Sequence, residues 1–235
     1  MSSTARVIGQ IHTVLRGTVQ PYPRPDGNAG DRSAIDKHPV AGPVAVRALG
    51  LEGDEQGNLR VHGGPDKAVH HYAQEHYPLW RAELGELPVL QQPGAFGENL
   101  ASTGVTEASL CWGDQVRIGS TLLELAQLRQ PCWKLNVRFG QRDMALRLQR
   151  TGRTGWYWRV LQEGQLQAGD AIELVARPHP EWPLTRVVDV LYHHALDRTQ
   201  LQQLAQLRLP ASWEKLVQAR LEHGQVEDWA RRVHG

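Results

Sequence analysis

The stretch WGDQVRIGSTLLELAQL, residues 112–128, decides the fold. It sets Gly113 and Asp114, two residues that favour turns, directly before a strand-like run. The stretch AGDAIELVARP, residues 168–178, repeats this order. A Gly-Asp pair before a strand is a common way for a chain to turn a corner and enter a barrel strand. We therefore expect a β-rich, barrel-like domain.

Upstream of residue 112 the sequence mainly predicts short strands and turns. Residues 6–19 are rich in β-branched side chains and alternate in part between apolar and polar, which is typical of a strand. Residues 20–33 carry too much Pro and Gly for a regular element, so we expect a loop. Residues 34–56 predict short strands broken by Pro and Gly. Residues 64–85, GPDKAVHHYAQEHYPLWRAELG, predict one helix that begins near Asp66 and stops at Gly85.

Downstream of residue 128 the predicted barrel domain is completed by two elements. We expect a short helix over residues 140–152, closed by Gly152, and then a strand over residues 156–164. After a Pro-rich loop over residues 177–185, the pattern of the sequence becomes helical.

Three helical segments are expected in the last part of the chain. Apolar residues such as Leu201, Leu204 and Leu207 recur at helical spacing there, and Asp197 and Ser212 are predicted as N-caps. The whole chain therefore predicts an α+β fold. We expect a barrel-like domain over residues 1–180 and a small three-helix domain over residues 181–235.

The composition limits the chemistry. The chain has 235 residues, 40% of them hydrophobic, and only 2 cysteines. Its apolar runs stay below the ~18 residues that cross a bilayer, and its start lacks the profile of a secretory signal, so we expect a cytoplasmic protein without a membrane partner. A disulfide framework is not expected, and too few thiolates are present for an iron–sulfur cluster. Any redox reaction would therefore need electrons from another protein.

Basic residues gather in one segment of a nearly neutral chain. The net charge is +1, but residues 129–159 contain a single acid, Asp143, and many cations (Arg129, Lys134, Arg138, Arg142, Arg147, Arg150, Arg153 and Arg159). Two interpretations remain open at this point. The segment is either the solvated face of a helix or the holder of a phosphate-bearing ligand near Cys132.

Cys132 lies in the stretch QLRQPCWKLN, residues 127–136. Adjacent cations favour the thiolate form of a cysteine, which attacks electrophiles or binds soft metals, and Pro131 restricts the backbone directly before it. The alternative is a buried, inert cysteine. Cys111 has no cations beside it, and for that residue we expect the inert role.

Two further motifs are candidates for ligand binding. In RVHGGPDKAVHHY, residues 60–72, His62 precedes Gly63 and Gly64, which allow close backbone approach, and Lys67 follows at a predicted helix start that could bind an anion. The alternative is an ordinary Gly-rich turn. In PGAFGENLASTGVTE, residues 93–107, the side-chain amide of Asn99 could bind the edge of a heterocycle, or it could simply form a turn.

Two other functions are weighed and set lower. His71 and Glu75, one helical turn apart in the predicted helix, could share a zinc ion with Cys132, but the spacing matches no standard zinc motif, so we expect core or surface histidines. The last helices could form a helix-turn-helix with Arg208, Lys215 and Arg220 facing DNA. Several acids in the same segment oppose this, so no nucleic-acid partner is expected (Asp197, Glu214, Glu222, Glu227 and Asp228).

Taken together, the motifs resemble the MOSC-domain family, named for the molybdenum cofactor sulfurase C-terminal domain. Four stretches occur in the family's order: LGLEGDEQGNLRVHGGPDKAV, PGAFGENL, GVTEASLCWGDQVRIG and QLRQPCWKLN. The chain is most similar to the bacterial YiiM-type branch, which adds a C-terminal three-helix domain. The resemblance spans residues 5–232.

The resemblance implies a β-barrel that binds a pterin-based molybdenum cofactor, with the thiolate of Cys132 as the protein ligand of the metal. It implies that further residues bind the cofactor. One group lies around the pterin and its phosphate (His62, Gly63, Gly64, Lys67 and Asn99), a second flanks the metal ligand (Arg129, Lys134 and Asn136), and Arg32 and Ser33 lie near the first loop, where the phosphate is expected. Relatives often show Lys-Ser or Lys-Pro-Ser where this chain has Asp31-Arg32-Ser33, and arginine can hold a phosphate as lysine does.

The resemblance also implies a reaction. Relatives reduce N-hydroxylated compounds, and the YiiM-type branch is associated with detoxification of 6-N-hydroxylaminopurine and similar base analogues. We therefore expect a two-electron reductase that takes electrons from a separate electron-transfer reductase, and the resemblance is consistent with a homodimer. The alternatives are a cofactor-binding or sulfur-carrying protein without this turnover, a cysteine-nucleophile or zinc hydrolase, and a DNA-binding module.

Overall fold

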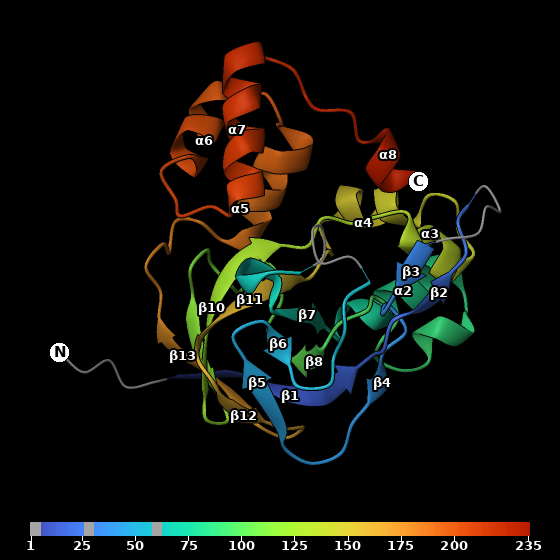
Figure 1. The fold of residues 1–235 in the computed structure, drawn as a ribbon. Helices are drawn as coiled ribbons and strands as arrows, with labels where there is room; N and C mark the ends of the chain where they lie inside the picture. The colour runs from blue at the N-terminus through green and yellow to red at the C-terminus, as the bar shows by residue number, and fades with distance from the viewer. Residues whose placement is uncertain (1–5, 26–30, 58–62) are drawn as a thin grey trace.

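The centre of the protein is a closed β-barrel (Figure 1). The computed structural model describes residues 6–25, 31–57 and 63–235. Seven strands of this part of the chain form the barrel in the order β13, β9, β10, β11, β7, β8 and β1, and β1 pairs with β13 to close it. Their bounds are β1 (Arg6–Arg16), β7 (Val69–Ala73), β8 (Leu100–Thr103), β9 (Gln115–Ile118), β10 (Thr121–Leu128), β11 (Trp156–Gln162) and β13 (Ala171–Ala176). Helices follow the barrel in the chain, so the predicted α+β fold with a barrel-like domain is confirmed.

The two Gly-Asp pairs open barrel strands, as predicted. Gly113 and Gly169 have φ values of 73° and 93°, in the left-handed region that favours glycine. Asp114 accepts a hydrogen bond from the Cys111 N–H at 2.9 Å, and Asp170 accepts one from the Gln167 N–H at 2.9 Å. Each aspartate thus closes the turn that precedes its strand, β9 or β13.

The helix predicted over residues 64–85 is wrong in its first half. A 3-10 turn, η1 (Pro65–Lys67), leads into strand β7, and helix α2 (His76–Leu84) begins only afterwards; it ends at Gly85 as expected. All five β7 residues are buried, because the strand lies between β11 and β8 and is covered on both faces. Such a strand shows no alternation, so its pattern cannot be distinguished from that of a buried helix.

Smaller elements surround the barrel. They are β2 (Gln20–Tyr22) paired with β3 (Asp31–Ser33), β4 (His38–Pro39) on the edge of β1, β12 (Gly164–Leu166) with β5 (Val44–Arg47) and β6 (Gly50–Leu51), the turn η2 (Pro88–Leu90), and helices α3 (Lys134–Phe139) and α4 (Met144–Thr151). Gly152 ends α4 in the left-handed conformation, as predicted. Helix α3 begins two residues after Cys132 and therefore fixes where the cysteine loop ends.

The C-terminal part of the chain is helical, as expected. Its elements are α5 (Leu184–Val188), the π-helical turn η3 (Asp189–His193), α6 (Arg198–Leu204), α7 (Ala211–His223) and α8 (Ala230–Val233). Asp197 caps α6 by accepting a hydrogen bond from the Gln200 N–H at 3.0 Å. Ser212 is not an N-cap, because α7 already begins at Ala211, directly after Pro210. Leu201, Leu204 and Leu207 are buried.

Two apolar clusters hold these parts together. The larger one runs from the barrel interior into α5, α6 and α7, where Trp112 and Trp213 lie 5.5 Å apart between ring centroids. The smaller one joins α2, α3 and α4 and includes Tyr72 stacked on Phe96 at 4.0 Å. None of the helices in residues 6–25, 31–57 and 63–235 has the length and apolar character needed to cross a bilayer.

Candidate functional site

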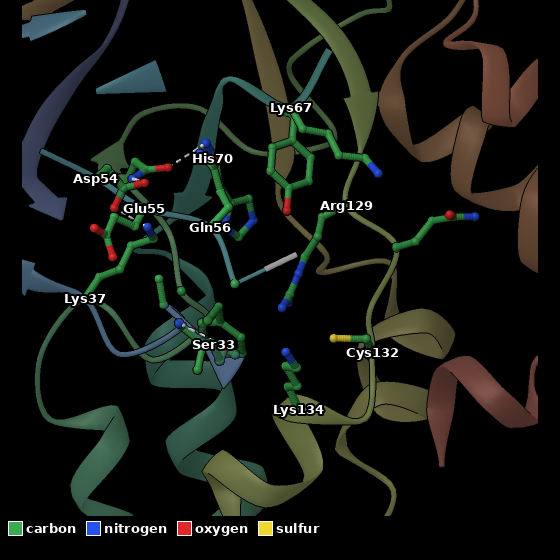
Figure 2. Close-up of a pocket in the computed structure, with 18 residues that line it drawn as sticks. Ser33, Lys37, Asp54, Glu55, Gln56, Lys67, His70, Arg129, Cys132 and Lys134 are labelled. Atoms are coloured by element: carbon green, nitrogen blue, oxygen red, sulfur yellow. Dashed lines mark hydrogen bonds and ion pairs between the residues drawn. The ribbon is translucent and has the colours of Figure 1, made fainter. Parts of the chain in front are cut away.

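A pocket of about 660 Å³ lies where the cysteine loop meets the barrel. This volume includes space that is open to solvent. Several residues predicted from the sequence line it: Ser33, Lys67, Asn99, Arg129, Cys132 and Lys134. The structure adds others that the sequence analysis did not assign to the cofactor: Lys37, Asp54, Glu55, Gln56, His70, Gln130 and Tyr157. Figure 2 shows that Arg129, Lys134 and Cys132 extend into the same space from different sides.

Cys132 is the cysteine that faces the pocket. It lies on the loop between β10 and α3 and is partly exposed. Cys111 is buried instead, and its Sγ lies 3.6 Å from the carbonyl oxygen of Pro180. Burial raises the pKa of the Cys111 thiol. Thiol chemistry at the pocket therefore falls to Cys132.

Arg129 brings a buried positive charge to the pocket wall. Arg129 is only 6% exposed, and its Nη1 has no hydrogen-bond partner among the described residues. The backbone N–H of Arg129 donates to the Gly155 carbonyl at 3.0 Å, which fixes the residue at the end of β10. A buried guanidinium nitrogen without a hydrogen-bond partner is costly. An acceptor or anion bound in the pocket would remove that cost.

Lysines add to the positive character of the pocket. Lys134 Nζ donates to the Arg32 carbonyl at 2.6 Å and lies 3.3 Å from an Asp31 carboxylate oxygen. Lys37 is ion-paired with Asp54. Burial lowers the pKa of Lys67. All three of these lysines line the pocket.

His70 and Tyr157 form a ring-lined part of the wall. Their ring centroids lie 4.8 Å apart with an interplanar angle of 32°. Burial, and next the charge of Arg129, lower the pKa of His70 well below its usual value, so the imidazole is neutral at pH 7. Its Nε2 has no hydrogen-bond partner in the part of the chain that the structure describes. Burial raises the pKa of Tyr157, which keeps the phenol protonated.

Asn99 lines the pocket, but its amide is engaged by the protein. Its Oδ1 accepts a hydrogen bond from the His70 N–H at 3.1 Å. Its Nδ2 donates to Asp54 Oδ2 at 2.9 Å and to the Leu15 carbonyl at 3.3 Å. Asn99 therefore ties β7, β1 and the loop of Asp54 together and fixes the shape of the wall.

The structure does not bring the remaining predicted residues to the pocket. Arg32 is exposed, and its Nη2 donates to the Val19 carbonyl at 3.4 Å. Asn136 is buried on α3, where its Nδ2 donates to the Val233 carbonyl at 2.7 Å. Gly63 and Gly64 precede η1 without lining the pocket. His62 lies outside the described residues.

The basic run of residues 129–159 serves two purposes. Arg129 and Lys134 line the pocket. Other members form ion pairs elsewhere: Arg138 with Asp36, Arg147 with Asp143, Arg153 with Glu83, and Arg159 with Asp66 and Glu124. The interpretation as a ligand holder thus applies to two positions, and structural ion pairs account for these others.

His71 and His76 form hydrogen bonds with protein groups. His71 Nε2 is hydrogen-bonded to the Ser102 hydroxyl at 2.6 Å, and its Nδ1 accepts from Trp158 Nε1 at 2.9 Å. His76 is bonded to Glu107 at 2.6 Å. Within the described residues, no group of three or more His, Cys, Asp or Glu side chains is arranged to hold a metal ion. The expectation of core histidines therefore agrees with their burial.

Comparisons with known proteins agree with this architecture. A MOSC-domain family model matches residues 58–173, and a model of the YiiM-like 3-alpha helix domain matches residues 182–224. Protein YiiM of Escherichia coli is 39% identical over 94% of this chain and 97% of its own length. The chain belongs to the MOSC-domain family. Its crystallised relatives include YiiM from E. coli, with 33% identity and a TM-score of 0.74, covering 94% of this chain and 99% of that one.

Other MOSC relatives extend the comparison. The crystal structure of YiiM from Geobacillus stearothermophilus has a TM-score of 0.76 at 33% identity, covering 91% of this chain and 99% of that one. A protein of Gibberella moniliformis named a reductase is 40% identical over 80% of this chain, which corresponds to 34% of its own length. In this MOSC protein, Ser33, Lys37 and Asp54 come from the segment before the matched family model, so the pocket wall extends beyond it.

Proposed function

We propose that this protein is a molybdenum-cofactor-dependent reductase of N-hydroxylated compounds, with base analogues of the 6-N-hydroxylaminopurine type as the substrate class. The observation that carries the proposal is the convergence of one thiol and two cations on a single pocket: Cys132, Arg129 and Lys134. The name of one relative, a reductase, supports the reaction class.

The residues present fit the cofactor. A cysteine thiolate is a soft donor suited to molybdenum, and Cys132 offers its sulfur on the pocket wall. Arg129, with an unsatisfied buried Nη1, together with Lys134 and Lys67, would hold the phosphate of the pterin. When bound, the cofactor would supply the two-electron redox couple and a Lewis acid.

The overall reaction converts R–NHOH, two electrons and two protons into R–NH2 and water. The N–O bond breaks, and the oxygen leaves as water. A separate electron-transfer reductase provides the electrons, since 2 cysteines cannot hold an iron–sulfur cluster. The chain's own residues shape the pocket. Protonated Tyr157 and neutral His70 present hydrogen-bonding groups on its wall, where a flat heterocycle can be oriented.

The test compares Cys132→Ala with Cys111→Ala, both made in cofactor-competent cells. We expect wild type and Cys111→Ala to carry molybdenum and to reduce 6-N-hydroxylaminopurine when an electron-transfer reductase is added. Cys132→Ala should lose more than about 100-fold in activity, because it lacks the metal ligand. Elemental analysis and turnover are the two measurements.

Four outcomes would contradict parts of the proposal. Full activity of Cys132→Ala would remove the role given to that thiol. Reduction of the substrate by a protein that contains zinc and no molybdenum would remove the role given to the molybdenum cofactor. Molybdenum binding without reduction of any N-hydroxylated substrate would favour a cofactor-binding or sulfur-carrying protein. Turnover by the isolated protein with NADH alone would remove the need for a separate electron donor.

A further inference from the structure

The C-terminal helix α8 contacts the cysteine loop on both sides of Cys132. Arg232 Nη1 donates to the carbonyl oxygen of Pro131, the residue before the cysteine, at 2.6 Å. The N–H of Trp133, the residue after it, donates to the Arg232 carbonyl at 2.8 Å. One residue of the tail thus forms hydrogen bonds to both neighbours of Cys132.

Two more contacts fix the tail itself. Arg232 Nη2 donates to Gln149 Oε1 at 2.6 Å, and the Val233 carbonyl accepts from Asn136 Nδ2 at 2.7 Å. Gln149 and Val233 are 4% and 2% exposed, so these contacts are shielded from water. Figure 1 shows α8 beside α3 and α4, the two helices that supply Asn136 and Gln149.

The contacts satisfy backbone groups that would otherwise lack partners. Trp133 is the N-cap residue of α3, and the N–H groups at a helix start have no partner within their helix. Carbonyl groups at a helix end, such as that of Arg232 in α8, likewise have no partner within their helix. The tail therefore supplies hydrogen-bond partners to the Pro131 carbonyl and to the Trp133 N–H of the cysteine loop.

The tail is joined to the helical part of the chain by ion pairing. Arg220 of α7, only 2% exposed, binds Glu227 through Nε at 2.9 Å and Nη2 at 2.8 Å. Glu227 in turn accepts a hydrogen bond from Trp229 Nε1 at 2.7 Å, and the Arg232 guanidinium lies 5.9 Å from the Trp229 ring centroid. A continuous set of contacts therefore runs from α7 to the cysteine loop.

We propose that Arg232 is a positioning residue for Cys132: it holds the loop so that the thiol stays on the pocket wall. The tail that carries it, residues 225–235, lies outside both family models that match the chain. The inference rests on the contacts alone and holds whatever chemistry the thiol performs. Its test therefore needs no cofactor.

The experiment measures how fast iodoacetamide alkylates Cys132 in the full-length protein, with buried Cys111 as the internal reference. It compares Arg232→Ala, Arg232→Lys and the neighbouring exposed control Arg231→Ala. Losing hydrogen bonds from a charged donor should raise the alkylation rate of Cys132 and the amide exchange rate of Trp133 about tenfold in Arg232→Ala. Arg231→Ala and the Cys111 reference should match wild type.

Arg232→Lys keeps the charge and can reach one of the two acceptors of the guanidinium, so it should lie between wild type and Arg232→Ala. If Arg232→Ala does not fold, Arg232→Lys tests the proposal instead. The proposal then requires that Cys132 in Arg232→Lys is alkylated faster than Cys132 in the wild type. Unchanged Cys132 alkylation in the folded Arg232 variants would overturn the proposal. An equal rise in Arg231→Ala, or at Cys111, would overturn it as well, because the effect would then be a general loosening.

Discussion

Arg129 combines a cost in stability with a use in binding. Its guanidinium is buried, and Nη1 has no partner among the described residues. Folding therefore places a charge where it is poorly solvated and incompletely hydrogen-bonded. A buried group of this kind is often kept for a ligand rather than for the fold. The proposed cofactor phosphate is a ligand that would complete its hydrogen bonds.

Replacing Arg129 by Gln should therefore separate binding from stability. We expect the molybdenum retained after gel filtration to fall about 10-fold or more, since a hydrogen bond to a charged group is lost. The melting temperature of the cofactor-free protein should not fall. Arg150→Gln, an exposed position in the same basic run, is the matched control. Equal retention by the two variants would contradict the role of Arg129.

The buried histidines of β7 should remain neutral as the pH falls. Burial lowers the pKa of His70 well below 6.5 and that of His71 to about 3. Unfolded histidines bind a proton below about pH 6.5. The unfolded state then binds more protons than the folded state, so their contribution to stability is full above that pH and is lost progressively in acid, with a slope of about 1.4 kcal/mol per pH unit for each histidine.

Nuclear magnetic resonance can check this directly. The imidazole resonances of His70 and His71 should show no titration between about pH 5 and 8 in the folded protein. In the urea-unfolded chain the same resonances should titrate near 6.5. A folded-state titration near neutral pH would contradict the prediction.

The sequence indicated part of the site, for reasons that are visible at single residues. Arg129 and Lys134 stand beside Cys132 in the chain, so their common position could be predicted. His70 and Tyr157 come from β7 and β11 and meet only because those strands pair. Asn136 turned out to face away from the pocket because residues two apart on a helix point to opposite sides, and Lys134 already faces the pocket.

At the scale of elements, turn residues were more informative than apolar patterns. Gly113 and Gly169 marked the starts of β9 and β13 because positive φ values leave a distinct residue preference. Strand β7, buried on both faces, left no alternation to recognise. Helix α8 was not predicted, since a helix of one turn has too little periodicity to detect.

Gly155 lies directly before β11, beside β7 and the end of β10, and should not tolerate a side chain. Its φ is 73°, and an added Cβ would lie 2.5 Å from the His71 carbonyl oxygen. We expect Gly155→Ala to destabilise the fold by about 2 to 5 kcal/mol, from backbone strain and overpacking together. Gly169→Ala also has a positive φ but open space around it, so about 1 to 2 kcal/mol is expected. Urea unfolding measures both; equal losses would contradict the crowding at Gly155.

At the scale of the molecule, the barrel and the helices share one apolar core. The division into residues 1–180 and 181–235 stays a prediction about organisation. Because Trp112 of the barrel side contacts Trp213 of α7, we expect the two parts to unfold together. Residues 110–112 and 182–184, where the two parts meet, also pair in the manner of strands. The Trp112 N–H donates to the Trp182 carbonyl at 2.8 Å, and the Leu184 N–H donates to the Leu110 carbonyl at 2.9 Å.

Trp213→Ala should lower the stability of the whole protein by about 3 to 5 kcal/mol, because it removes a large buried ring. The unfolding transition should remain single. Far-ultraviolet circular dichroism and tryptophan fluorescence should therefore give the same midpoint. Leu196→Ala, at a residue that is 48% exposed, is the control and should stay within about 0.5 kcal/mol of wild type. Helices that melt before the barrel would contradict the shared core.

The closure of the barrel by its first and last strands has a consequence for synthesis. Strand β1 leaves the ribosome early, whereas its partner β13 follows at residues 171–176, on the order of ten seconds later at ordinary elongation rates. During that interval one edge of β1 has no strand beside it. That edge carries Arg6 and Gln10, and its register shifts between Val7 and Gly9. The charge of Arg6 and the irregular register both disfavour pairing with another nascent chain. We therefore expect the residues that finally pair with β13 also to limit association at this edge until β13 has been made.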